Sequence, residues 1–446
     1  MKRFPPALRI GLIVFVFFLP LLSGVLGKIA KSHAWFGDYR AVACGAQKII
    51  DGGALYDLNL KCAAMEGTTA VYVYLPVVAE AFAGVIRLIG QDGLIWLYGA
   101  LYVLSLVVLL GGAYFSPPLQ SGGGGAQRRR GLTDTDTPSV FAASGIESTS
   151  PAVAGEEKLH PTLLDKIPFA AFLTGSAVVW GNIAVLCHAA VLASAMVAKR
   201  YPLLFAAVVA LCGVIKPVFL TYLLVLLFID LPLWKRLGWS AVAAIAGLLP
   251  TVLFATEGSA LSQSWRATLS GFVYTTTPGE SFYGWLGLMG LRGDSVGANL
   301  GWLVFAGLMA LSGLAIAEGL KFDTRARIWL GLSLGVLTIP RLMSQDVFLI
   351  GVGLAYIALY SPSLIATSKP LSVLKDRGRT ILTVICVFCL IGGAAELGDF
   401  TTRISTLLLS LYVLAAGVLT FAQRRDAILT ALLLRPLPRK SARVPD

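Results

Sequence analysis

The chain has 446 residues, of which 57% are hydrophobic and only 13% are charged. That charge is too sparse to cover a soluble domain of this size, and the apolar surface is too large to be hidden inside one. The formal net charge of +12 would suit nucleic acid, but the basic residues lie in short loops and at the C-terminus rather than among exposed aromatic side chains. Composition therefore predicts an integral membrane protein that contacts the lipid bilayer and binds no nucleic acid.

Apolar runs of about 20 residues, the length that a helix needs to cross a bilayer, recur along the whole chain. The strands of a membrane barrel would instead alternate apolar and polar residues. The predicted spans are residues 8–27, 71–90, 93–115, 182–198, 202–215, 217–229, 238–257, 299–317, 328–340, 347–360, 380–397 and 404–422. Several are too short to cross alone, so a neighbouring pair could form one kinked crossing. The expected fold is an all-α polytopic membrane protein with about 10–12 transmembrane helices.

Composition divides the chain into four segments. Residues 1–115 hold the first transmembrane helices and an outer loop, and residues 116–166 form a low-complexity linker rich in glycine, serine, threonine and proline. Residues 167–423 form the main transmembrane bundle, and residues 424–446 form a basic cytoplasmic tail. Within the bundle segment, the short apolar run 167–180 predicts an interfacial or re-entrant helix.

The basic residues predict which loops lie inside. An uncleaved first helix with its N-terminus inside places most basic loops on the inner face, as the positive-inside rule requires. The exception is the run of three arginines at 128–130, which the same alternation places outside. Long loops are exempt from the charge rule, so the predicted topology keeps this loop outside.

The sequence predicts different roles for two pairs of cysteines. Cys44 and Cys62 both lie in the first outer loop, where an oxidising compartment would permit a disulfide. Without geometry, two free thiols are an equal alternative. Cys386 and Cys389 lie inside an apolar span with no histidine nearby, so we expect them to pack as small apolar side chains.

Residues 35–40, just beyond the first predicted span, contain the strongest candidate for a catalytic residue. Asp38 follows two aromatic residues and a glycine, and Tyr39 and Arg40 come directly after it. An acid in an outer loop is usually only solvated, but a semi-apolar setting at the membrane interface raises a carboxyl pKa toward the range useful for a base. We therefore expect Asp38 to be a general base.

Further polar residues fall on the same side of the membrane, at the ends of spans or in breaks between them. They are Tyr74, Asn182, Lys216, Ser281, Arg341 and Asp346. A polar break at membrane depth is costly unless it lines a cavity, and Lys216 and Arg341 could hold an anionic phosphate there. For Lys216 the alternative is that its ammonium reaches lipid head groups. Glu80, inside the second predicted span, is either functional or part of a structural ion pair.

Motifs of several enzyme classes are missing from the sequence. It contains no P-loop, no dinucleotide-binding glycine motif, no zinc-protease motif and no serine-triad motif. His33, His160 and His188 have no metal-ligand spacing, so we expect ordinary structural roles for them. The sequence therefore predicts no metal and no cofactor.

The order of these features resembles that of the family 87 glycosyltransferases, which belong to the GT-C superfamily. That family carries an acid and an aromatic residue in the first outer loop, a glycine followed by a Tyr-Asp turn, a Tyr-Pro, a Gly-Gln-x-Asn and a Lys-Pro. The matching residues here are Asp38, Tyr39, Gly52, Gly53, Tyr56, Asp57, Lys216 and Pro217. Tyr74 and Pro76 match the Tyr-Pro with one residue inserted, and the Gly-Gln-x-Asn is reduced to Gly181 and Asn182. Relatives often carry two histidines before a late span, whereas residues 341–346 of this chain contain none, so no catalytic histidine is carried over.

The resemblance implies a GT-C-type bundle with catalytic loops outside a bacterial cytoplasmic membrane. It implies transfer of a mannose-like hexose or an arabinofuranose from a polyprenyl-phosphate donor to a hydroxyl group of a lipid or glycan acceptor. Asp38 would be the base, and the donor phosphate would contact Lys216, Arg341 and Arg40. The substrate-binding residues would be Tyr39, Tyr74, Asn182, Ser281 and Asp346. The alternative is a transporter or flippase of a lipid-linked glycan, which would also use polar breaks in its spans.

Overall fold

A computed structural model of the chain describes residues 36–57, 62, 71–115, 160–166, 169, 172, 176–365, 378–394 and 397–433, together with the isolated positions 11, 22 and 26. Within these residues all regular structure is helical. The first predicted span, most of the linker and the end of the basic tail lie outside the described residues. Predictions about them, including the run of arginines at 128–130, are therefore not examined by this structure.

The helices follow one another along the chain with few residues between them. They are α2 (Gly37–Asp51), α3 (Pro76–Leu110), η2 (Gly111–Phe115), α4 (Leu163–Lys166), α5 (Ser176–Val179), α6 (Ile183–Met196), α7 (Pro202–Ile215), η4 (Pro217–Leu223), α8 (Leu224–Phe228), α9 (Leu233–Thr256), α10 (Ala260–Thr268), η5 (Leu269–Thr276), α11 (Phe282–Leu288), α12 (Val296–Gly319), α13 (Thr324–Leu337), η6 (Val347–Leu349), α14 (Ile350–Ile365), α16 (Gly378–Ala394) and α17 (Gly398–Leu433).

Four of the described helical segments are long and apolar enough to cross a membrane. They are Pro76–Ala113, Leu233–Thr256, Val296–Gly319 and Asp399–Leu432. Shorter apolar helices, such as Ile183–Met196, accompany them. A helix of 14 residues is only about 21 Å long, less than the thickness of a bilayer core. The structure thus has the helical architecture and the apolar segments of a membrane protein.

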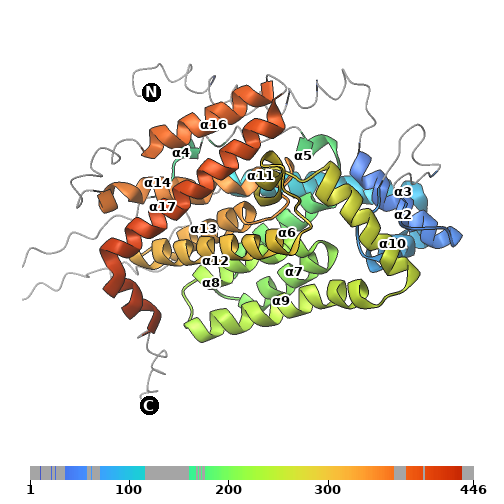
Figure 1. The fold of residues 1–446 in the computed structure, drawn as a ribbon, viewed down its shortest axis with the longest axis horizontal. Coiled ribbons are helices and arrows are strands. Elements are labelled where there is room, and N and C mark those ends of the chain that lie inside the picture. The colour runs from blue at the N-terminus through green and yellow to red at the C-terminus, as the bar shows by residue number, and fades with distance from the viewer. Residues whose placement is uncertain are drawn as a thin grey trace, which may run out of the picture.

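The bundle has two ends, which we name after a residue at each. At the Asn182 end α6 begins, α7 finishes and α11 begins, whereas at the Arg236 end α9 and α13 begin and α12 finishes. In Figure 1 the long helices run between the two ends, and α2 and α10 gather beyond one of them, on the right of the view. Along the bundle α12 packs on α17, α7 on α9, and α13 on α14.

A buried charge cluster holds the Arg236 end together. Glu318 accepts hydrogen bonds from Arg236 at 3.0 Å and from both terminal nitrogens of Arg327 at 2.8 Å, and the three side chains are 1%, 1% and 4% exposed. The two arginines also donate to backbone carbonyl oxygens of residues 227, 231, 228 and 322. Both arginines lie in helices, and they can be buried because Glu318 and the carbonyl groups satisfy their charge.

Helix α3 turns back on itself at Gly90, which has φ 74° and ψ 173°. The rings of Phe82 and Tyr98 lie 6.2 Å apart although each is eight residues from Gly90, whereas a straight helix would separate them by about 24 Å. The first half of α3 therefore forms an antiparallel pair with the second half. This first half thus lies beside both α2 and the second half of α3.

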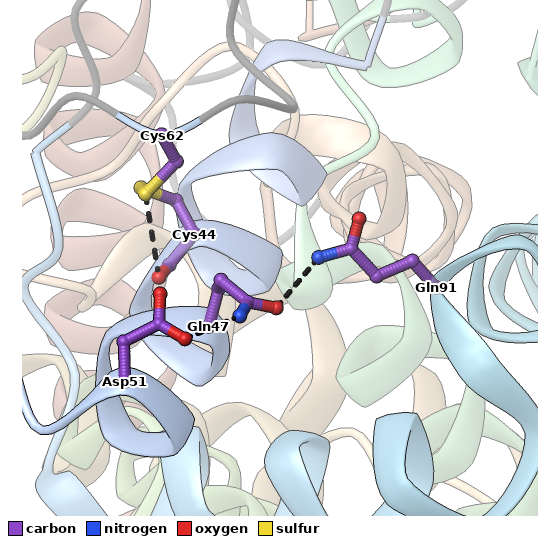
Figure 2. The surroundings of a disulfide bond; sticks show 5 residues. All are labelled: Cys44, Gln47, Asp51, Cys62 and Gln91. Carbon is purple, nitrogen blue, oxygen red and sulfur yellow. Dashed lines mark hydrogen bonds between the residues drawn. A yellow bond between two sulfur atoms is a disulfide. The ribbon is translucent and has the colours of Figure 1, made fainter.

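Side chains of α2 contact the loop that follows this helix and the turn of α3. A disulfide joins Cys44 and Cys62, whose Cα atoms lie 5.7 Å apart, so the paired alternative is the one found. The amide of Gln47 donates a hydrogen bond to Asp51 and accepts one from Gln91 of α3, each at 2.7 Å (Figure 2). These contacts fix the position of α2 beyond the end of the bundle.

The second half of α3 runs from the Asn182 end to the Arg236 end. Tyr98 donates to the carbonyl oxygen of Gly181 at 2.8 Å, and fifteen residues later the carbonyl oxygen of Ala113 accepts from Lys166 at 3.0 Å. His160, on the other side of the linker, lies 3.8 Å from Asp323 at the start of α13. Ala113 and His160, which are described on either side of the gap between residues 115 and 160, therefore both lie at the Arg236 end.

The chain returns to the Asn182 end between Lys166 and Val179. The carbonyl oxygen of Val179 accepts from the backbone N–H of Phe36, and that of Trp180 accepts from the N–H of Asp38, both at 2.9 Å. The predicted interfacial or re-entrant helix over residues 167–180 lies mostly outside the described residues, and its last part forms α5 at the Asn182 end.

Two pairs of short helices are hairpins, not single kinked crossings. α7 and the η4–α8 pair turn at Lys216 and Pro217, and both far ends lie at the Arg236 end. α13 and α14 likewise turn through residues 338–346, since the distal part of α14 contacts His160 near the start of α13. Both turns face the Asn182 end, which brings Lys216 and the 338–346 loop to the same end as Asp38.

Candidate functional site

Asp38 lies in the first turn of α2 and is held by Asn182. The Nδ2 group of Asn182 donates to Oδ2 of Asp38 at 2.6 Å, and the Oδ1 atom of Asn182 accepts from the backbone N–H of Ala184 at 2.8 Å. Asn182 is therefore the N-cap of α6 and at the same time the orienting group of the carboxylate. Asp38 is half-buried, so its carboxylate is oriented without being sealed from ligands.

Aromatic rings form one wall beside Asp38. The ring of Tyr39 is buried and lies 4.7 Å from that of Tyr98, and Phe36 packs against Tyr102 at 5.2 Å. Burial raises the pKa of Tyr39 to about 12, so its phenol is neutral at physiological pH. A Cβ atom on Gly181, which has φ 61°, would meet the ring of Phe36 at 2.6 Å, so this close approach requires glycine. Tyr39 is thus part of the wall that supports Asp38.

Tyr74 is buried and interacts electrostatically with three of the predicted residues. Its phenol is within electrostatic range of Asp38, Arg341 and Asp346, and burial raises its pKa above the usual range for tyrosine. Its backbone carbonyl oxygen accepts from Tyr56 at 2.8 Å, which fixes the chain just before α3. The fold therefore brings together residues that are more than 300 positions apart in the sequence.

Asp346 is part of a buried network that the sequence did not predict. Its Oδ1 atom lies 3.0 Å from Nε2 of His188, whose Nδ1 atom lies 2.6 Å from the hydroxyl of Tyr222. Burial alone would raise the pKa of Asp346, but the charge of Lys216 and the hydrogen bond with His188 outweigh it and hold that pKa below its usual range. Asp346 is therefore an ionised carboxylate, and His188 is a site residue that motif spacing missed.

Two cations flank this carboxylate. Lys216 caps the end of α7, and within the described part of the chain its ammonium makes no hydrogen bond or ion pair. Arg341 donates from Nε to the carbonyl oxygen of Thr277 at 2.7 Å and from Nη2 to its hydroxyl at 2.5 Å. Burial lowers the pKa of Arg341, and the negative charge of Asp346 raises it, so the guanidinium group stays cationic. Both cations keep donors for an anion.

Ser281 and Arg40 lie differently from the other predicted residues. Ser281 is fully buried, donates to the carbonyl oxygens of Ile339 and Pro340, and accepts from the N–H of Leu342, so it clamps the loop that carries Arg341. Its predicted contact with substrate would require this loop to open. Arg40 is two residues beyond Asp38, about 200° around the same helix, which points the two side chains to opposite sides.

No group of three or more metal-ligating side chains is found in the part of the chain that the structure describes. Comparisons with protein-family models, with curated proteins and with solved structures found no match for this chain. The resemblance to family 87 therefore depends on the motifs of the sequence itself.

The arrangement combines three chemical capacities at one end of the bundle. It has an oriented, half-buried carboxylate at Asp38, cations at Lys216 and Arg341, and an ionised buried carboxylate at Asp346. Such a set can remove a proton from a hydroxyl group and can stabilise a leaving phosphate. His188 was missed, but it carries a signal, since it stands among apolar residues and an ionisable residue there is a functional candidate.

Proposed function

We propose that this protein is a membrane glycosyltransferase that uses a polyprenyl-phosphate sugar as its donor. The observation that carries the proposal is the Asp38–Asn182 contact of 2.6 Å in the same cluster as Arg341, Lys216 and Asp346. A general base needs a fixed carboxylate near the acceptor, and a phosphate leaving group needs fixed cations. The cluster supplies both.

The proposed reaction is a displacement at the anomeric carbon of the donor sugar. Asp38 takes the proton of the acceptor hydroxyl, whose oxygen forms the new bond to the anomeric carbon. The bond between that carbon and the phosphate oxygen breaks, and its electron pair leaves with the polyprenyl phosphate. Lys216 and Arg341 stabilise the charge that develops there, because oriented cations in a site of low dielectric constant need no reorganisation during the reaction.

The sugar in this proposal is a mannose-like hexose or an arabinofuranose, and the acceptor is a lipid or glycan hydroxyl group outside a bacterial cytoplasmic membrane. The disulfide at the Asn182 end supports that orientation, because disulfides persist in oxidising compartments. Exposed basic residues at the other end, such as Arg200 and Lys235, support it as well.

The test is transfer by Asp38→Asn protein reconstituted in liposomes. Polyprenyl-phosphate mannose and polyprenyl-phosphate arabinofuranose serve as donors, with a total membrane lipid extract as the source of acceptor. We expect the rate to fall about 100-fold or more, because the amide keeps the shape and cannot accept the proton. Asp51→Asn, on the exposed end of the same helix, should transfer like the wild type.

Transfer by Asp38→Asn at the wild-type rate would show that Asp38 is not the base. A lack of transfer from either donor by the wild type, together with movement of lipid-linked sugar between leaflets, would instead favour a flippase.

A further inference from the structure

Glu280 is a buried acid whose backbone is fixed on both sides. It lies in the turn between η5 and α11, where its N–H donates to the carbonyl oxygen of Leu342 at 2.7 Å and its carbonyl oxygen accepts from Thr406 of α17. The preceding Gly279 has φ 84°, and a Cβ atom there would meet the carbonyl oxygen of Leu342 at 2.6 Å. The turn therefore holds Glu280 against the loop that carries Arg341.

The carboxyl group of Glu280 has no partner within the described part of the chain. The residue is 5% exposed, and its Oε2 atom is buried without a hydrogen bond. Arg403, a cation whose charge acts on Glu280, donates from Nε to the carbonyl oxygen of Gly279 at 2.9 Å and forms no ion pair with Glu280. An unsatisfied buried polar group costs about 1–3 kcal/mol, so its presence needs an explanation.

Glu318 shows how the same chain satisfies a buried acid that has a structural role. That carboxylate accepts three hydrogen bonds from Arg236 and Arg327. The carboxyl group of Glu280, in contrast, forms no ion pair with Arg403, which instead donates to the carbonyl oxygen of Gly279. The contrast indicates a group whose partner comes from outside the protein.

The surroundings of Glu280 define the chemistry of that partner. Burial raises the pKa of Glu280 well above the usual range, and the charges of Asp399 and Asp346 raise it further while Arg403 opposes them. A protonated carboxyl group offers one O–H donor and acceptor oxygen atoms. An apolar chain would leave the group unsatisfied, whereas a hydroxyl group both donates and accepts.

We propose that Glu280 binds a hydroxyl group of the sugar on the lipid-linked donor and positions that sugar over the Asp346 end of the cluster. This inference depends on the proposed function, because it assumes that the ligand of the cluster is a lipid-linked sugar. Lys216 and Arg341 would hold the phosphate, and Glu280 would hold the sugar.

The test compares the binding of two lipids, polyprenyl-phosphate mannose and bare polyprenyl phosphate, to protein in nanodiscs. We expect Glu280→Leu to weaken binding of the glycosylated lipid about tenfold or more, the cost of about one hydrogen bond, and to leave binding of the bare lipid unchanged. Glu280→Gln should keep most of the affinity, because an amide also donates and accepts. Glu257→Leu, at an exposed glutamate beyond α9, is the matched control.

A second measurement needs no variant. Among monodeoxy-mannose donors, at least one should bind the wild type about tenfold more weakly than the full donor. Equal affinities for all monodeoxy donors, or equal loss of both lipids in Glu280→Leu, would overturn the inference. Selective loss of the glycosylated lipid in a protein that transfers no sugar would support the role of Glu280 and would contradict the proposed transferase.

Discussion

Asn182 makes two hydrogen bonds that serve different purposes. Its Oδ1 atom caps α6 and so stabilises the fold. Its Nδ2 atom donates to Asp38 and so orients the proposed base. One side chain thus couples the start of a bundle helix to the position of the base. The two purposes can be separated by substitution, because aspartate caps a helix about as well as asparagine but has no amide to donate.

We predict that Asn182→Asp will unfold at nearly the wild-type temperature but transfer sugar at least about tenfold more slowly, because Asp38 loses its donor and gains a like charge beside it. Asn182→Ala should lose both the activity and about 1 kcal/mol of stability, the usual cost of removing an N-cap. Thermal unfolding in detergent and single-turnover transfer rates measure the two effects. Wild-type rates in Asn182→Asp would show that this contact does not position the base.

At the residue scale, the sequence predicts polar residues better than it predicts their partners. Asp38, Tyr74, Arg341 and Asp346 could be selected because polar groups beside membrane spans are costly without a purpose. The 2.6 Å contact with Asn182 could not, since it joins residues 144 positions apart. His188 was missed because metal-ligand spacing was the criterion applied, whereas its partner is a single carboxylate from a distant loop.

At the scale of elements, hydropathy locates apolar helices but not their direction. Most predicted spans correspond to helices of the bundle, because burial in protein and burial in lipid select the same residues. Within the predicted span 71–90 an apolar helix begins at Pro76, yet the chain folds back at Gly90 beside α2. The turn depends on the backbone of one glycine, which a hydropathy window cannot detect.

We predict that Gly90→Ala will lower the stability of the protein by about 1–3 kcal/mol, because a φ of 74° with a ψ of 173° is a conformation that essentially only glycine adopts. No atom lies within 4 Å of the Cβ position, so the effect would be backbone strain without a clash. Gly84→Ala, at a helical position in α3 that is equally open, is the control and should be neutral or slightly stabilising. Equal unfolding temperatures for the two variants would show that the turn at Gly90 is not maintained in the membrane.

At the scale of the whole molecule, the two ends of the bundle differ in chemistry. The Asn182 end has the disulfide and the candidate site, and the Arg236 end has the buried arginines, both flanks of the linker and exposed basic residues. The predicted topology placed the loop with the arginines at 128–130 outside, and those arginines lie beyond the described part of the chain. The described residues on either side of that gap, such as Ala113 and His160, lie at the Arg236 end.

This separation predicts which end of α9 is accessible from outside the cell. Asp230 precedes the helix at the Arg236 end, and Glu257 follows it at the Asn182 end, about 36 Å away along 24 residues; both are exposed. In intact cells we expect a membrane-impermeant maleimide to label Glu257→Cys at once and to label Asp230→Cys only after permeabilisation. The background should be low, because Cys187, Cys212, Cys386 and Cys389 are buried and Cys44 is disulfide-bonded. The reverse pattern of labelling would place Asp38 on the cytoplasmic side, where an acceptor outside the membrane could not reach it.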